Sequence, residues 1–359
     1  FVSIAMLTNR ILLILALFIS ILYLLPVVKL FTFLNKRKFF ILFLIAFLSR
    51  LLMLKIVVVP DVDIFFNLKY RVMEITRFQN PYRVDYQYPQ NLSIIPSFYP
   101  YGPLLAPLMV PFNFFGDPRY ALILSDFITA LVLYKLVSPK KTIIKQLVPL
   151  IFLYAPQSLF FASVSAVDNI IVALFTLFFY WFYQKKYIFA FLAFSFIGGI
   201  KHAYALTIFF TLKNKNPKKV ILPFLVFLAI MLISYGIFAL WDFDGLKTNL
   251  LGTFTSLTNT WIVPASLSFQ AFLVKQSIIL PQINFQPSIV FGIIPFITIY
   301  LVTLLFLERS IYKLALAIAI SLFAFIFFSP YALIQYYTVV SALILIALSL
   351  SLDPKNLND

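Results

Sequence analysis

The sequence predicts an all-α polytopic membrane protein, and three observations lead to this prediction. The chain of 359 residues is 63% hydrophobic and only 11% charged, whereas a soluble domain carries about 25% charged residues. Many of its apolar runs approach the length of about 20 residues that a bilayer-spanning helix needs. The runs do not alternate between apolar and polar residues as a membrane β-barrel does, and helices satisfy all of their backbone groups inside lipid.

The apolar segments that predict the helices are separated by short polar breaks. They cover residues 11–32, 39–58, 103–116, 119–137, 146–164, 166–183, 187–200, 203–212, 219–241, 288–307, 311–328 and 335–351. We expect about 10 to 12 transmembrane or half-membrane helices in a single transmembrane domain over residues 1–359. Two longer polar stretches, 59–102 and 242–287, are predicted to be external loops, and the first should carry a juxtamembrane helix over 64–76.

The distribution of basic residues predicts how the helices are oriented. The formal charge is +16, and the lysines and arginines gather in short clusters at 35–38, 140–145, 185–186 and 213–219, between apolar runs. Short basic loops stay in the cytoplasm, so both long loops are expected outside. Because the cations form such topology-setting clusters, we expect membrane lipids and no nucleic acid among the partners.

One part of this topology requires a segment that does not cross the membrane. Two apolar segments, 103–116 and 119–137, separate the first external loop from Lys140, where an odd number of crossings is needed. Segment 103–116 is short and contains Pro107 and Pro111, so we expect it to lie at the interface or to re-enter. The alternative is that Lys140 and its neighbouring lysine are external.

Two further apolar segments, 187–200 and 203–212, are too short to span the bilayer separately. We expect them to be half-helices that meet at Gly198-Gly199, with Lys201 and His202 facing the outer side. Ionisable residues at membrane depth are costly and usually face a cavity, so Lys201 is a candidate to bind a lipid phosphate and to stabilise it as a leaving group. The alternative is that Lys201 extends to the headgroups and that His202 is a packing residue.

Two carboxylates, Asp61 and Asp63, stand where the chain leaves the second predicted span. As a structural feature they would cap a helix, because Asp is common before a helix start. As a functional feature one of them would act as a general base near the outer leaflet, or the pair would bind a divalent cation, Mg²⁺ or Mn²⁺, through hard oxygen ligands. The chain has no cysteine and one histidine, which excludes thiolate chemistry and multi-histidine zinc sites.

Polar residues near other helix ends are further candidates. Asp168 would cap a helix or line the same external cavity, and Asp126, which lies inside an apolar helix, should have a buried partner. Tyr331, Gln335 and Tyr336 would belong to an interfacial aromatic belt or would line a polar headgroup pocket.

The acidic pair opens a series of motifs whose order resembles a known superfamily. The motifs that follow it are Asn80-Pro81-Tyr82, the Tyr-Pro-rich stretch 99–105, Ser125-Asp126-Phe127, residues 154–158, Asp168, residues 198–201, and Ser329-Pro330-Tyr331 with residues 335–337. Together they resemble the GT-C fold glycosyltransferases, and are similar to mannosyltransferases of the GPI-anchor first-mannose type and to related archaeal and bacterial enzymes. The likeness covers most of 55–345. The chain departs from the pattern in an insertion over 85–98 and at Gln79, where glycine is usual.

The resemblance implies an inverting glycosyltransferase. It would move a sugar, mannose or another hexose, from a polyprenyl- or dolichyl-phosphate carrier to an acceptor hydroxyl of a lipid-linked or protein-linked glycan. Asp63, slightly favoured over Asp61, would be the base, and Lys201, with Arg77 or Arg83, would hold the donor phosphate. The residues expected to contact substrate are Asp168, His202, Tyr82, Tyr331, Gln335 and Tyr336.

The same reading places the active site on the outer or luminal face, in the plasma membrane of a prokaryote or in the ER membrane. Abundant Ile, Lys, Phe and Tyr without Cys suit an archaeon. The main alternative is a polytopic transporter or lipid flippase, which would show an inverted repeat or charges along a pore, and the sequence displays neither. A structural or assembly role, or another enzyme of lipid headgroups such as an acyltransferase that uses His202, are further alternatives.

Overall fold

The computed structural model describes residues 36–90, 92–96, 98–138, 142–213, 217–258, 266–276, 292–306, 310–329 and 332–352. These residues form helices and contain no strand. In chain order, with η for a 3₁₀ helix, they are α2 Lys36–Ile56, α3 Asp63–Lys69, η2 Arg71–Arg77, α4 Leu105–Phe114, α5 Arg119–Leu136, α6 Thr142–Tyr154, α7 Pro156–Ser163, α8 Asp168–Tyr183, α9 Tyr187–Ile200, η3 His202–Lys213, α10 Pro217–Trp241, α11 Phe243–Thr258, α12 Phe269–Lys275, α14 Ile294–Phe306, α15 Ile311–Phe328 and α16 Ile334–Ser351.

Helix length and composition identify a membrane-embedded chain. Four described helices are long and apolar enough to span a bilayer: Arg37–Ile56, Lys218–Trp241, Ile311–Phe328 and Ile334–Ser351. The pair α6 and α7, bent by 44°, is a fifth if it is counted as one span. The bend falls where Pro156 begins α7, because proline has no N–H to continue the hydrogen bonds of α6. The all-α membrane class is confirmed, while the predicted segment 11–32 lies outside the described residues.

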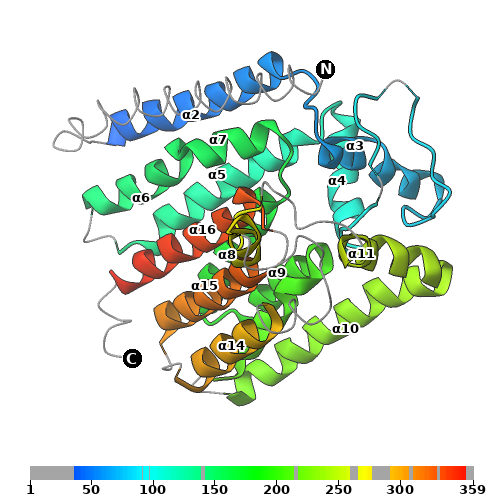
Figure 1. The fold of residues 1–359 in the computed structure, drawn as a ribbon. Helices are drawn as coiled ribbons and strands as arrows, with labels where there is room; N and C mark the ends of the chain where they lie inside the picture. Colours follow the sequence, from blue (N-terminus) through cyan, green and yellow to red (C-terminus); the bar gives the residue numbers. More distant parts are fainter. Residues whose placement is uncertain are drawn as a thin grey trace.

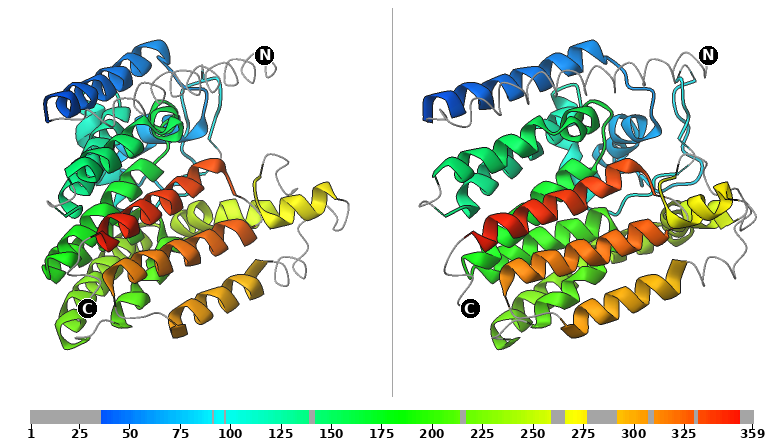
Figure 2. Two further views of the ribbon diagram at one scale, coloured as in Figure 1. Left: turned by 90° about the vertical axis from the view of Figure 1, so that its left-hand side faces the viewer. Right: turned by 60° about the vertical axis from the view of Figure 1, so that its left-hand side comes forward.

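The long helices lie side by side, and the helices α3, α4 and α11 gather at one end of the bundle (Figures 1 and 2). We call this the loop end, defined as the end where α2 stops and α5 begins, and the opposite end the basic end. A single side chain joins the two helices there. Arg119, the first residue of α5, donates hydrogen bonds to the carbonyl oxygens of Val57 (2.5 Å) and Val58 (3.1 Å), just beyond α2.

Segment 57–118 therefore leaves the bundle and returns at the same end. Within it, α4 has 10 residues, which gives a length of about 15 Å, half of the hydrocarbon thickness. It packs against η2, α3 and the ends of α5 and α9. This agrees with the expectation that 103–116 does not cross the membrane.

The ends of the bundle differ in charge. Among the described residues, the basic end carries lysines and arginines and no Asp or Glu. The cations there are Arg37, Lys38, Lys135, Lys145, Lys185, Lys186, Lys213, Lys218, Lys219 and Lys313. The described acids belong to the loop end or, in the case of Asp126, to the helix interior.

Three local predictions need correction. Helix α9 continues through Gly198-Gly199 and ends at Ile200, so the break before η3 lies at Lys201, whose backbone is extended (φ −129°, ψ 90°). The predicted helix over 64–76 is two elements, α3 and η2, interrupted at Tyr70. The second predicted loop, 242–287, contains the helices α11 and α12.

Aromatic packing explains why α9 is held firmly despite its 14 residues. Phe194 lies edge-on to Phe178 of α8, with ring centroids 5.2 Å apart, and edge-on to Phe227 of α10 at 5.7 Å. Such pairs each contribute about 0.5–1.5 kcal/mol beyond the burial of their area. The C-terminal end of α9, which carries Lys201, is thereby fixed between its two neighbours.

Candidate functional site

Lys201 is held by one acid and two aromatic rings at the loop end. Its Nζ lies 2.6 Å from Oδ1 of Asp168, the first residue of α8. The same Nζ lies 4.5 Å from the ring centroid of Tyr336 in α16 and 5.6 Å from that of Tyr204 in η3. Asp168 is buried and Lys201 retains 16% exposure. We call these four residues the Lys201 cluster, in which cation–π contacts supplement the ion pair.

The end of the first polar loop attaches directly beside this cluster. The N–H of Gly102 donates to Ile200 O at 2.8 Å, and the N–H of Leu104 donates to Gly199 O at 2.9 Å. A Cβ on Gly102 would overlap the Gly199 carbonyl, and one on Gly199 would overlap the Leu104 side chain. The two glycines therefore permit a backbone contact that no other residue type allows. The sequence analysis did not assign this role to Gly199.

Tyr101, next to this contact, shows that acids from two parts of the chain share one environment. Burial raises the pKa of Tyr101, and the carboxylates of Asp63 and Asp168 raise that pKa further, together with Tyr336. Because charge interactions weaken with distance, both carboxylates belong to the electrostatic surroundings of Tyr101. That Asp63 and the amine of Lys201 converge at one pocket stays a prediction from the sequence.

Asp63 begins α3 and combines solvent access with partial desolvation. Its Oδ1 accepts a hydrogen bond from the N–H of Ile64 at 2.8 Å. The side chain reaches solvent, but the protein around it displaces enough water that desolvation raises the pKa of Asp63 above its ordinary value, opposed by the backbone hydrogen bonds. In Asp61 one carboxylate oxygen is buried and has no hydrogen-bond partner among the described residues.

Arg119 fastens the chain on both sides of the site, and no motif in the sequence pointed to it. Besides the carbonyls of Val57 and Val58, its guanidinium bonds Ser163 O at 3.1 Å and pairs with Asp117 at 2.6 Å. Val58 precedes Asp61 by three positions, and Ser163 precedes Asp168 by five. One buried cation therefore ties the segment before the acidic pair to the turn before α8.

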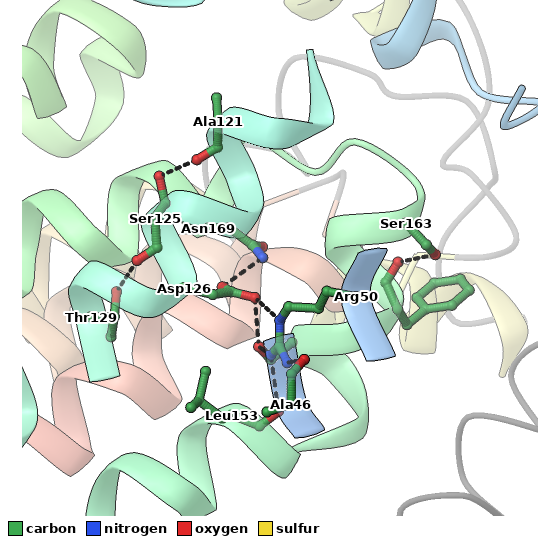
Figure 3. A network of polar contacts seen from close by, with 11 residues as sticks. Ala46, Arg50, Ala121, Ser125, Asp126, Thr129, Leu153, Ser163 and Asn169 are labelled. Carbon is green, nitrogen blue, oxygen red and sulfur yellow. Dashed lines mark hydrogen bonds and ion pairs between the residues drawn. The ribbon is translucent and has the colours of Figure 1, made fainter. Parts of the chain in front are cut away.

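A second buried cation, Arg50, supplies the partner that was expected for Asp126 (Figure 3). Its Nε lies 2.8 Å from Oδ2 of Asp126. Asp126 also accepts hydrogen bonds from Ser158 Oγ (3.0 Å) and from Asn169 Nδ2 (2.9 Å). Arg50 was missed by sequence reasoning, although an arginine inside the apolar run 39–58 is itself the signal of a functional or paired charge.

Arg77 and Arg83 are not brought to Lys201. They lie 3.5 and 3.1 Å from the carboxylate of Glu74, and Arg77 is 73% exposed. Both were expected to hold the donor phosphate with Lys201. Instead the acid three positions before Arg77 pairs with both of them locally.

Tyr82 lies in the packing of the loop. It is completely buried, its hydroxyl donates to Tyr101 O at 2.6 Å, and its N–H donates to Asn80 Oδ1 at 2.9 Å. Asn249 of α11 donates to Tyr82 O at 2.6 Å. The Asn-Pro-Tyr motif thus fastens the loop to α11, and in this structure Tyr82 offers no free group to the substrate contact that was expected of it.

The remaining candidates are placed as follows. Gln335 is buried in the first turn of α16, beside Tyr336, and Tyr331 lies outside the described residues. His202 follows Lys201, and its Nδ1 is buried without a hydrogen-bond partner among the described residues. Among the residues that the structure describes, no three His, Asp or Glu side chains gather as metal ligands. A divalent cation at Asp61 and Asp63 would therefore take its other ligands from water or substrate.

Comparisons with models of known protein families, with curated proteins and with solved structures found no match for this chain. The likeness to GT-C glycosyltransferases therefore rests on the order of the sequence motifs.

Proposed function

We propose that the chain is a membrane glycosyltransferase that moves a hexose from a polyprenyl- or dolichyl-phosphate carrier to a hydroxyl of a lipid-linked or protein-linked glycan. One observation carries the proposal. Asp63, a carboxylate with solvent access, and Asp168, the buried partner of the Lys201 ammonium, come from distant parts of the chain, and both raise the pKa of Tyr101 at one end of a membrane bundle. A base and a cation for a leaving group are the two groups that inverting transfer from a sugar phosphate needs.

The reaction follows from these two groups. Asp63 takes the proton of the acceptor hydroxyl as that oxygen forms a bond to the anomeric carbon. The bond from this carbon to the phosphate oxygen breaks, and the phosphate leaves with the electron pair. Lys201 stabilises the charge on the departing phosphate, and Asp168 and Tyr336 hold the ammonium in place beforehand. A raised pKa makes Asp63 a stronger base than an ordinary aspartate.

The charge distribution supports an outward or luminal site. Basic ends of membrane helices stay in the cytoplasm, and the described residues of the basic end include no acid. The loop end then faces the outer leaflet. A lipid-linked donor presents its sugar at headgroup depth, which is the level of the first residues beyond a membrane helix.

The experiment is transfer from a radiolabelled polyprenyl-phosphate hexose by purified protein in lipid. Asp63→Asn, or failing that Asp61→Asn, is expected to lower the rate at least about 100-fold while the protein remains inserted and folded. Asp85→Asn, at an exposed acid of the same loop, is the matched control and should retain activity. Full activity of both Asp63→Asn and Asp61→Asn would refute the assignment. Movement of the intact donor across the membrane of proteoliposomes, without loss of its sugar, would favour the flippase alternative.

A further inference from the structure

We infer that the buried pair Arg50–Asp126 is a positioning device for the Lys201 cluster. Through Asn169 it fixes the start of α8, and with it the direction in which Asp168 points. The catalytic consequence of this inference rests on the proposed function. Its structural part rests on the contacts alone.

Two consecutive residues at the start of α8 bind partners in different directions. Asp168 holds Lys201 at 2.6 Å, and the Nδ2 of Asn169 donates to Oδ1 of Asp126 at 2.9 Å. Consecutive side chains of an α-helix point about 100° apart. A helix start that is bound in both directions can neither rotate nor slide without breaking one of the two bonds. The bond between Asn169 and Asp126 therefore determines where Asp168 meets Lys201.

Asp126 is itself immobilised from the other side. Its second oxygen, Oδ2, receives both Arg50 Nε at 2.8 Å and Ser158 Oγ at 3.0 Å. Arg50 in turn donates to Ala46 O at 3.1 Å and to Leu153 O at 2.9 Å. All the charged and polar side chains of this network are buried. The anchor of α8 is thus tied to α2, α5, α6 and α7 at once (Figure 3).

The turn that precedes α8 needs such an anchor. Ser165, between α7 and α8, has a left-handed backbone (φ 68°) although it is not glycine. A residue of this kind persists only where the surrounding structure imposes its conformation. The chain also gains little stability from a buried ion pair, since apolar residues of the same shape do as well or better. Fixed geometry at Asp168 is the property that the pair supplies and that apolar packing would not.

The test measures how fast Lys201 of the full-length protein reacts with an amine-acylating ester, read by peptide mass spectrometry. A protonated amine that is bound to Asp168 reacts slowly with the ester. Asp168→Asn, which removes this partner, therefore gives the highest labelling rate of Lys201 against which the other variants are compared. Asn169→Ala leaves Arg50 and Asp126 paired, yet it should raise the labelling of Lys201 about tenfold over wild type, which is the effect of losing a hydrogen bond to a charged group. Thr176→Ala is the matched control, because Thr176 is buried on the same helix and donates to Val172 O at 2.7 Å.

Labelling of Asn169→Ala at the wild-type rate overturns the inference. Should Asn169→Ala fail to fold, Asn169→Ser takes its place, because serine retains a hydrogen-bond donor of shorter reach. Lys201 should then be labelled at an intermediate rate, and labelling at the wild-type rate would likewise overturn the inference. The readout uses no sugar donor, so it is independent of whether the chain transfers sugar. In an active preparation, Asn169→Ala should also lower kcat/KM about 100-fold, as a small displacement of a reacting group does, whereas Thr176→Ala should not.

Discussion

The contact between Gly102 and Gly199 gives the sharpest prediction about how the loop is held against the Lys201 cluster. In Gly102→Ala the new Cβ would meet the Gly199 carbonyl, with its carbon at 2.8 Å, and the hydroxyl of Tyr235 at 2.5 Å. The carbonyl is backbone and cannot rotate away, so the loop must move off α9. Overpacking of this kind costs about 1–3 kcal/mol. The two backbone hydrogen bonds to Ile200 and Gly199 are lost as well, at about 1 kcal/mol each.

Gly102→Ala is therefore expected to lower the free energy of unfolding by about 3–5 kcal/mol. The chain contains a matched control, since a Cβ on Gly236, inside α10, would meet nothing within 4 Å. Gly236→Ala should be neutral or stabilise by up to about 1 kcal/mol through helix propensity. Denaturant unfolding of both variants in detergent micelles measures the difference. Equal stability of the two variants would refute the close approach of the loop to α9.

Three further predictions test charge, orientation and the buried pair. Desolvation raises the pKa of Asp63, and a general base acts when it is deprotonated. Transfer activity should therefore rise with pH, and the midpoint of this rise should lie above the ordinary pKa of an aspartate. A midpoint at that ordinary pKa would contradict the assignment of Asp63 as the base. In this cysteine-free chain, a membrane-impermeant maleimide on intact cells should label Phe78→Cys, at a side chain 90% exposed, and not Lys186→Cys; the reverse pattern inverts the topology. Arg50→Met alone should cost about 3–5 kcal/mol of unfolding free energy, and adding Asp126→Leu should recover most of it; additive losses would argue against the pair.

The helices were largely predictable because local composition determines them. In α9 and α15 an apolar run stops at a charged or polar residue, and the element ends at the same place. Counting crossings between basic clusters predicted a segment that does not span the bilayer, and the 10 residues of α4 agree with that expectation. The break at Lys201 was placed two residues early because Gly198-Gly199 was taken as the interruption, whereas these glycines accommodate the loop from outside the helix.

The site was predictable only where a charge interrupts an apolar run. Lys201 and Asp168 carried that signal, and the structure pairs them. Apart from Asp117, the partners of Arg119 are backbone carbonyls, which the identity of a residue does not reveal. The pairing of Arg77 and Arg83 with Glu74 was missed because a distant phosphate was considered before the acid nearby in the chain.

The buried pair also constrains how the protein is made. Arg50 enters the bilayer with α2, yet its counter-ion stands 76 positions later, on α5. An arginine within a membrane helix costs up to about 2.5–3.5 kcal/mol during insertion by the translocon, the full value applying at the helix centre, and Arg50 lies six residues before the end of α2. The nascent chain must carry this cost until α5 emerges from the ribosome. The insertion of α2 is therefore stabilised only after segment 57–118, with its acids, has already been synthesised.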